Sequence, residues 1–210
     1  MKRRKAYAID RSKFLTLDET KKLLKVCDDL ASLDLLKGRS TWITRSMLVG
    51  LALRSGLRVS ELANLKVGDI HIGHNDSYLT VTRGKGGKRR DVYFNGALSK
   101  HLKSYLEIKK KSWRMSVTDS DYLFSHGDDG QKYSTTGLHL SVKKALRKVG
   151  LAHHTIHHCR HTYATILLQD TGGDIRAVQK QLGHASLSMT SLYADVLPQR
   201  RQELADKLSI

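Results

Sequence analysis

The chain has 210 residues, enough for one hydrophobic core or two small lobes, and an ordinary hydrophobic content of 40%. Thirty-seven lysines and arginines against 20 aspartates and glutamates give a formal net charge of +17, which favours a polyanionic partner, nucleic acid before an anionic membrane. The apolar run 47–53 is too short to span a bilayer, and no apolar stretch follows the basic residues 1–5 as in a secretory signal. Cys27 and Cys159 are far apart and match neither a disulfide framework nor a zinc motif, which fits the reducing cytoplasm. Together with the basic charge and the lack of a membrane span, this leads us to expect a cytoplasmic, nucleoid-associated protein without a membrane partner.

The first half of the chain predicts helices followed by a small sheet. Residues 1–13 are expected to form a basic arm, and Thr16 or Asp18 can cap a helix that continues through Leu30. The following elements are predicted in order: helices over 41–55 and 59–63, then strands over 67–72, 78–83 and 91–94. A glycine-rich basic hairpin, residues 83–90, joins the last two strands.

The second half predicts helices after a loop-rich stretch over 112–133, in which residues 122–124 form a short apolar anchor. The expected helices cover 97–110, 135–149, 160–170, 174–182, 187–195 and 199–208. The fold class is therefore α+β, one mostly helical domain with a small antiparallel sheet of about three strands. We place this domain at 14–197, followed by a C-terminal helix within 198–210.

Two short blocks near the C-terminus carry the residue types needed to attack a phosphodiester. Residues 157–165 contain a histidine and an arginine, and residues 182–193 contain a histidine with a tyrosine nine residues later. A hydroxyl nucleophile must lose a proton, the leaving oxygen must gain one, and the charge on the nonbridging oxygens must be met. Arginine suits the last task because its planar guanidinium binds phosphate oxygens in pairs. A further arginine, Arg58, lies in the block 55–62.

Taken together, these motifs resemble the catalytic domain of the tyrosine recombinases, the phage-integrase family. The family pattern is Gly-Leu-Arg-x-x-Glu-Leu, a hairpin lysine, His-x-x-Arg, Leu-Gly-His and a tyrosine nine residues further on, and all five parts occur in order over 55–193. The resemblance implies six catalytic residues and a supporting glutamate at Arg58, Lys85, His157, Arg160, His184, Tyr193 and Glu61. It also implies that the chain lacks the N-terminal core-binding domain of most members, as a short stand-alone recombinase or a fragment.

The resemblance gives each residue a role. Tyr193 is the nucleophile and forms a 3′-phosphotyrosyl link, while Lys85 protonates the departing 5′ oxygen. The two arginines and His184 hold the nonbridging oxygens, and His157 assists proton transfer or phosphate binding. On composition alone, Tyr163 and Tyr133 are rival nucleophiles.

The hairpin and the histidines leave alternatives open. Lys85 is preferred as the hairpin lysine because its flanking glycines allow close approach to DNA. The other basic hairpin residues are expected to bind DNA, and they are Arg83, Lys88, Arg89 and Arg90. Histidines at 153, 154, 157, 158 and 161 have helical spacings that suit a metal, but no carboxylate ligand set accompanies them, so we expect no metal and no cofactor.

The function implied by the resemblance is that of a site-specific DNA recombinase of the integrase or invertase type, independent of metal and ATP. Its expected partners are double-stranded DNA with a specific recombination site and three further copies of the chain in a homo-tetramer on that DNA. The C-terminal helix docks either on a neighbouring protomer or on its own domain. The alternatives are a type IB topoisomerase or telomere-resolvase-like strand transferase, and an inactive DNA-binding accessory protein.

Overall fold

The structure of the protein is a computed structural model that describes residues 11–74, 76–82, 89–111, 113, 117–126 and 130–183. The tip of the predicted hairpin and the predicted helices over 187–195 and 199–208 lie outside these residues, as does most of the predicted basic arm. The last residues of that arm, Arg11–Lys13, form a short 3-10 helix, η1.

Seven α-helices are described: α1 (Leu17–Leu36), α2 (Thr41–Ser55), α3 (Val59–Asn64), α4 (Gly96–Lys111), α5 (Thr135–Lys148), α6 (Ile156–Asp170) and α7 (Ile175–Leu182). Thr16 caps α1 as predicted, because its hydroxyl accepts the Glu19 N–H at 3.0 Å while the Glu19 carboxylate accepts the Thr16 N–H at 2.7 Å. The predicted bounds of α2 are confirmed.

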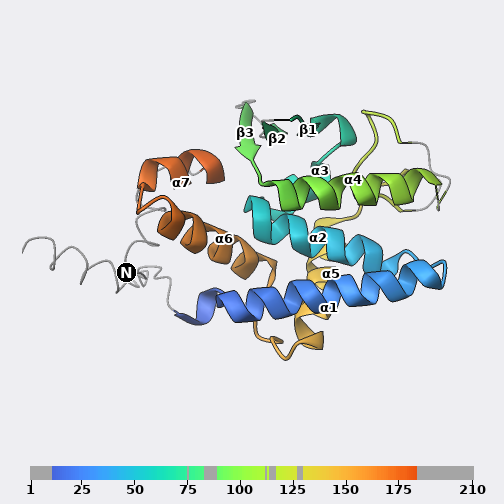
Figure 1. Cartoon of the computed structure of the whole chain (residues 1–210), viewed down its shortest axis with the longest axis horizontal. Helices are drawn as coiled ribbons and strands as arrows, with labels where there is room; N and C mark the ends of the chain where they lie inside the picture. The colour runs from blue at the N-terminus through green and yellow to red at the C-terminus, as the bar shows by residue number, and fades with distance from the viewer. Residues whose placement is uncertain are drawn as a thin grey trace, which may run out of the picture.

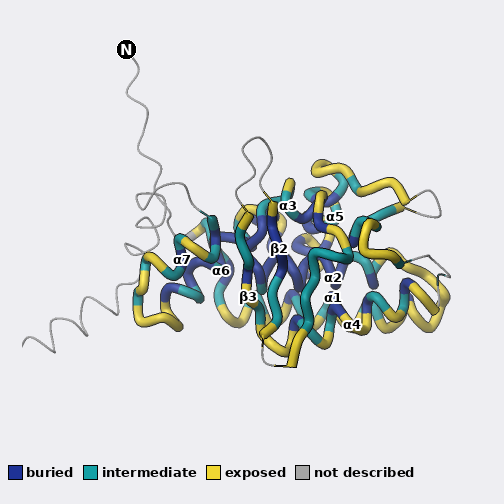
Figure 2. Tube along the Cα trace, turned by 90° about the horizontal axis from the view of Figure 1, so that it is seen from above, coloured by how far each residue is buried: buried dark blue, intermediate teal, exposed yellow. Residues whose placement is uncertain are grey.

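The helix α2 is the centre of the fold. Its residues from Arg45 to Leu53 are all buried, because α1, α4, α5 and α6 pack around it. A helix that is apolar on nearly every side must be covered on every side, which explains this arrangement. In Figure 1, α1 runs below α2, while α4 and the sheet lie above it. Figure 2 shows the buried segments along the middle of the molecule and the exposed stretches at its edges.

The sheet has three antiparallel strands in the order β1 (Ile70–Ile72), β2 (Ser77–Thr82) and β3 (Arg89–Tyr93). In the register of β2 and β3, Val81 lies opposite Arg90 and Thr82 lies opposite Arg89. The first predicted strand began too early, since Val67–Asp69 form a 3-10 helix, η2, instead. There the Asp69 carboxylate accepts the Lys66 N–H at 2.9 Å, which turns the backbone before the strand starts.

The start of α6 is the second correction to the predicted elements. We expected this helix to begin at residue 160, with His161 and Thr162 in its first turn, but it begins at Ile156. Ile156 and Cys159 are both buried in the main core, and this burial at helical spacing extends the helix backwards through the histidine run. Arg160 therefore lies one helical turn after His157, on the same side of α6.

Two clusters of buried side chains stabilise the fold. The larger one spans α1 to the start of α6, and the smaller one joins α6 to α7 through Ala164, Leu168, Val178 and Leu182. Among the helices that the structure describes, none is long and apolar enough to cross a membrane.

Candidate functional site

The turn between α2 and α3 contains the first motif block, residues 55–62. Gly56 ends α2 in the left-handed conformation, with φ of 63°. A Cβ atom at this position would collide with the Tyr163 ring and would lie 2.8 Å from the Leu182 side chain, so only glycine fits the corner. The chain then turns directly into α3, with Arg58 as the residue that precedes the first helical turn.

The Glu61 carboxylate lies at the centre of a cluster of guanidinium groups. It accepts the backbone N–H of Arg58 at 2.8 Å and the Arg58 side chain at 3.1 Å. Arg90 binds both oxygens of the same carboxylate, at 2.9 and 3.0 Å, in the bidentate geometry that favours arginine. Arg160 lies beside it, with one guanidinium nitrogen 4.0 Å from a Glu61 oxygen. One carboxylate thus faces three arginines from three separate elements.

This environment fixes the ionisation of Glu61. Burial alone would raise the pKa of Glu61, but the hydrogen bonds and positive charges of Arg90 and Arg58 outweigh it and lower the pKa below the ordinary glutamate value. The ionised carboxylate therefore stabilises the folded state above its unfolded pKa, and this contribution is lost as the pH falls through the lower, folded pKa.

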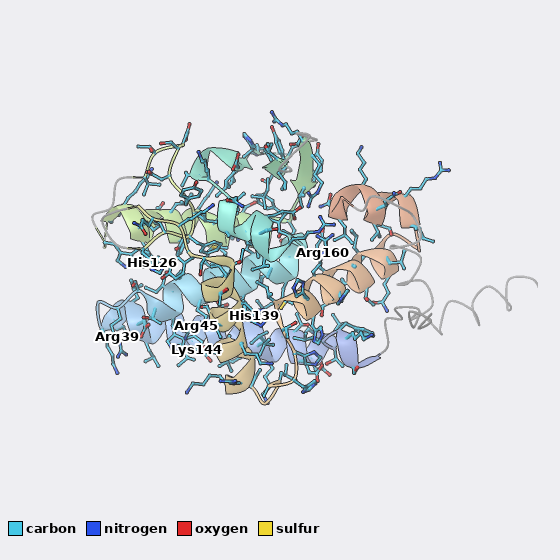
Figure 3. All side chains as sticks on the ribbon, turned by 180° about the vertical axis from the view of Figure 1, so that it is seen from behind. Arg39, Arg45, His126, His139, Lys144 and Arg160 are labelled. Atoms are coloured by element: carbon cyan, nitrogen blue, oxygen red, sulfur yellow. The ribbon has the colours of Figure 1, made fainter. Side chains whose placement is uncertain are left out.

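Arg160 joins three motif blocks through its side chain, which is only 8% exposed. Its guanidinium donates to the Gly56 carbonyl at 2.5 Å and to the Leu182 carbonyl at 2.9 Å. Gly56 precedes the Arg58 corner, and Leu182 lies two residues before His184. Figure 3 shows Arg160 where α6 approaches α2. The fold thus brings together the blocks 55–62, 157–165 and the start of 182–193.

Arg90 is placed differently from an arginine that faces solvent or DNA. It lies on the same face of β3 as the buried Val92, and its side chain is only 12% exposed. Its Nε donates to the Gln181 carbonyl at 3.3 Å, and a Cβ atom on Gly183 would lie 2.8 Å from its side chain. Gly183 ends α7 with φ of 64°, so a left-handed glycine again permits the close approach.

The neighbouring Arg89 points the other way, as strand alternation requires. Its side chain is 62% exposed, and it donates to the Thr80 hydroxyl at 3.2 Å. The two hairpin arginines thus lie on opposite faces of the sheet. The alternation of Arg89, Arg90, Asp91 and Val92 in the sequence is the signal that could have separated them, since Val92 marks the buried face.

His157 lies exposed in the first turn of α6. Partial burial of its ring, then the positive charges of His139 and Arg160, lower the pKa of His157. These two neighbours come from α5 and α6 and are labelled in Figure 3. A largely neutral imidazole can both donate and accept a hydrogen bond, which suits proton transfer.

The other histidines pack on one another. The Nδ1 atoms of His154 and His158 lie 2.9 Å apart, so a single hydrogen is shared between them. Burial, followed by the charges of neighbouring histidines, lowers the pKa of His158 to about 4. Burial and the charges of His158 and Arg160 lower the pKa of His161 to about 4. Among the described residues, no three histidine, cysteine or carboxylate side chains are grouped so that they could hold a metal ion.

The two rival tyrosines have structural surroundings of their own. Burial raises the pKa of Tyr163, and its hydroxyl accepts a 3.0 Å hydrogen bond from the Gln181 side chain. The Tyr133 ring stacks on His126, with 3.8 Å between the ring centroids. Both phenol rings are thus engaged in contacts within the protein.

A cleft of about 910 Å³ opens beside the arginine cluster. Its lining comes from α3, η2 and β2 and includes residues that the sequence did not single out: Ser60, Asn64, Lys66, Thr80 and Thr82. Arg58 also lines it and is the most exposed of the three arginines around Glu61, at 32%. The cleft combines a guanidinium with hydroxyl and amide groups, which are the usual protein partners of phosphate oxygens.

Five predicted site residues, Arg83, Lys85, Lys88, His184 and Tyr193, lie outside the described part of the chain. Of the described residues next to them in the chain, Thr82 lines the cleft, Arg89 lies opposite Thr82 in the sheet, and Gly183 lies against Arg90.

Comparison with known proteins agrees with this geometry. The model of the phage integrase family matches residues 13–200. The chain belongs to the phage integrase family. This integrase-family chain is 36% identical over 200 residues to the tyrosine recombinase XerA of Pyrococcus horikoshii, covering 94% of the chain and 62% of the relative. It is 35% identical over 196 residues to the tyrosine recombinase XerC of Caldanaerobacter subterraneus subsp. tengcongensis, covering 92% of the chain and 50% of the relative.

Solved structures of the family share the fold. The crystal structure of XerA recombinase aligns with a TM-score of 0.73 at 30% identity, over 99% of this chain and 66% of that chain. The XerH site-specific recombinase in its post-cleavage complex with palindromic difH substrate aligns with a TM-score of 0.74 at 25% identity, over 91% and 52%. The predicted fold, a mostly helical domain with a three-stranded antiparallel sheet, is confirmed. The integrase-family chain spans half to two-thirds of the length of these proteins.

We expect Glu61→Gln to lower the free energy of unfolding by roughly 3 kcal/mol, because it removes the carboxylate charge that Arg58 and Arg90 bind and that Arg160 approaches at 4.0 Å. Urea unfolding at pH 7 measures the change. Glu107→Gln is the matched control, since Glu107 is 67% exposed in a 3.7 Å pair with Lys111 and should cost less than about 1 kcal/mol. Equal effects of the two substitutions would contradict the central role of Glu61.

We also expect the folded state to lose stability as the pH falls from 6.5 towards 4. His158 and His161 have folded pKa values of about 4, against the ordinary 6.5, so the unfolded chain binds their protons first. His158→Gln should flatten the pH dependence of the free energy of unfolding in this range. His161→Gln should flatten it as well, because burial and neighbouring charges lower the pKa of His161 to the same value of about 4. A slope that His158→Gln does not alter would show that this histidine is not held neutral.

Proposed function

We propose that this chain is a site-specific DNA recombinase of the integrase or invertase type, which cleaves and rejoins DNA through a 3′-phosphotyrosyl intermediate. The observation that carries the proposal is the meeting of Arg58, Glu61 and Arg160 beside an open cleft. Arg58 and Glu61 belong to one motif block, and Arg160 belongs to another about a hundred residues later. If the cluster served only to stabilise the fold, its ion pairs would not require Arg58 to line an open cleft.

The similarity to known proteins supports the same activity. The relatives are tyrosine recombinases, and the XerH structures are complexes with difH substrate before and after cleavage. The net charge of +17 suits a duplex as the partner. We infer that this chain acts on double-stranded DNA with a specific site, as a homo-tetramer in the synaptic complex, in the cytoplasm at the nucleoid.

The proposed reaction is a transesterification at one backbone phosphate. The Tyr193 oxygen forms a bond to phosphorus, the bond between phosphorus and the 5′ oxygen breaks, and the tyrosine proton passes to a base, for which His157 is the candidate. Lys85 gives a proton to the departing 5′ oxygen. The number of phosphoester bonds is unchanged, so a free 5′ hydroxyl from another strand can reverse the step without ATP.

The arginines have different positions in this scheme. Arg58 lines the cleft and can reach the nonbridging oxygens directly, and Glu61 fixes the direction of its guanidinium. Arg160 lies deeper, and we propose that it turns one guanidinium edge to the phosphate while it keeps the motif blocks together. Arg90 we now assign a positioning role in place of the DNA contact first expected, while Arg89 remains a proposed DNA contact.

We propose that three segments of the chain have separate roles in this reaction. Residues 14–197 form the catalytic domain, residues 1–13 a basic arm, and residues 198–210 a C-terminal helix that docks on a neighbouring protomer. We propose that His184 completes the set of oxygen-binding groups, as the match of Leu182, Gly183 and His184 to the family motif implies.

We expect Tyr193→Phe to abolish the covalent protein–DNA adduct and to leave DNA binding nearly unchanged, because the substitution removes only the attacking oxygen. Trapping on a nicked suicide substrate, followed by denaturing electrophoresis, measures the adduct. Tyr163→Phe is the matched control and should retain the adduct, since its hydroxyl is bonded to Gln181. An undiminished adduct with Tyr193→Phe would overturn the nucleophile assignment.

We expect Arg58→Ala to slow cleavage on the order of a hundredfold or more while changing duplex affinity far less, because charge on the oxygens grows only in the transition state. Single-turnover cleavage at saturating DNA gives the rate, and a binding titration gives the affinity. Arg147→Ala, at an exposed arginine in the last turn of α5, is the control. Equal losses in rate and affinity would identify Arg58 as a ground-state DNA contact instead.

A further inference from the structure

Next to the cleft, three distant segments of the chain lie side by side and form a small platform. Residues 65–67 pair with 121–123, through Val67 N–H to Asp121 O at 2.9 Å and Leu123 N–H to Leu65 O at 2.8 Å. Residues 124–126 pair in turn with 131–133, through Tyr133 N–H to Phe124 O at 3.0 Å and His126 N–H to Gln131 O at 2.7 Å. The platform begins directly after α3 and so continues the wall that carries Arg58.

The ammonium groups of two lysines contact one tyrosine ring of this platform. Lys66 Nζ lies 5.7 Å from the centroid of the Tyr122 ring and Lys132 Nζ lies 5.3 Å from it, both within cation–π range. Lys132 also donates to the Asn64 side-chain oxygen at 2.5 Å, and the Asn64 amide donates to the Ser60 carbonyl at 2.7 Å. Both ammonium groups therefore lie in cation–π range of the same ring, and both lysines are exposed to solvent.

A buried lysine holds the tyrosine segment from beneath. Lys109 is 2% exposed, and its ammonium donates to the Leu123 carbonyl at 3.0 Å, the Tyr122 carbonyl at 3.4 Å and the Ser125 hydroxyl at 3.3 Å. Such an internal charge is costly unless its donors are satisfied, and here the segment 122–125 satisfies them. The ring that organises the two outer lysines thus sits on a fixed backbone.

The nearby carboxylates have backbone partners. Asp69 accepts the Lys66 backbone N–H at 2.9 Å, and Asp121 accepts the Thr118 N–H at 2.6 Å and the Thr118 hydroxyl at 2.9 Å. Among the described residues, no carboxylate forms an ion pair with the ammonium group of Lys66 or Lys132. The positive charge of each exposed lysine therefore remains available, as far as the described residues show, to attract an external anion.

We propose that Lys66 and Lys132, oriented by Tyr122 and Asn64, bind the backbone of the same DNA duplex at a phosphate other than the one that is cleaved. This inference rests on the proposed function and extends it. Lys66 and Asn64 line the cleft together with Arg58, so one continuous surface serves both phosphates. The contact is to the backbone, so it holds the duplex in register on the site without reading its sequence.

The test is the salt dependence of binding to a duplex that carries the recombination site, measured by fluorescence anisotropy with Lys66→Ala, Lys132→Ala and the double variant. Each phosphate contact that is lost reduces the magnitude of the slope of the logarithm of the association constant against the logarithm of salt concentration by about 0.9. It also weakens binding by about fivefold at 0.15 M salt. The double variant should lose one to two such contacts and keep the wild-type cleavage rate at saturating DNA. Lys103→Ala, at an exposed lysine on α4, is the control for general charge loss.

Lys132→Arg and Lys66→Arg should restore the slope, because they keep the charge. The inference is overturned if the double variant keeps the wild-type slope, or if the magnitude of its slope falls no further than that of Lys103→Ala. It is equally overturned if the cleavage rate at saturating DNA falls while the slope is unchanged. Failure of the proposed function looks different, since the wild-type chain itself would then fail to bind or cleave the duplex. Unchanged thermal unfolding of the variants confirms that exposed lysines were replaced without loss of the fold.

Discussion

The site depends on one carboxylate, Glu61, which offsets part of the positive charge of three guanidinium groups. Arginines that meet phosphate oxygens must lie close together, and without a counter-charge they would push the elements that carry them apart. Glu61 reduces this repulsion through direct hydrogen bonds to Arg58 and Arg90 and a 4.0 Å approach to Arg160. Because those arginines come from the start of α3, from β3 and from α6, a single side chain joins three parts of the fold.

The helix ends on either side of the cluster explain why two motif glycines are needed. Gly56 and Gly183 end α2 and α7 in the left-handed conformation, and each has a large side chain packed where a Cβ atom would lie. Arg160 then binds the carbonyl of Gly56 and that of Leu182, so the two helix ends are fixed to the same guanidinium. The glycines serve the close packing of protein segments, and the arginines depend on that packing for their positions.

Charge is divided between the surface and the interior in a way that suits a polyanionic partner. Arg90 and Lys109 are largely buried and bonded to carbonyls or to Glu61, so they act on structure. Arg160 is also buried and links the motif blocks, in addition to its proposed contact with the phosphate. Arg58 and Lys66 line the same cleft, and Lys132 is exposed beside Asn64 of that lining. The buried cations hold the exposed ones in place, which spares the binding step part of the entropy of ordering long side chains.

Much of this protein follows from the sequence alone. Apolar periodicity located the helices, the change of period located the sheet, and the motif spacing identified the family, because these signals are local or lie in fixed order along the chain. The errors fell where tertiary contacts compete with local preference. Burial of Ile156 extended α6 through the histidines, and Asp69 turned the backbone ahead of β1. Strand alternation indicates the inward direction of Arg90, but only the tertiary structure shows that its partner there is Glu61, 29 residues away.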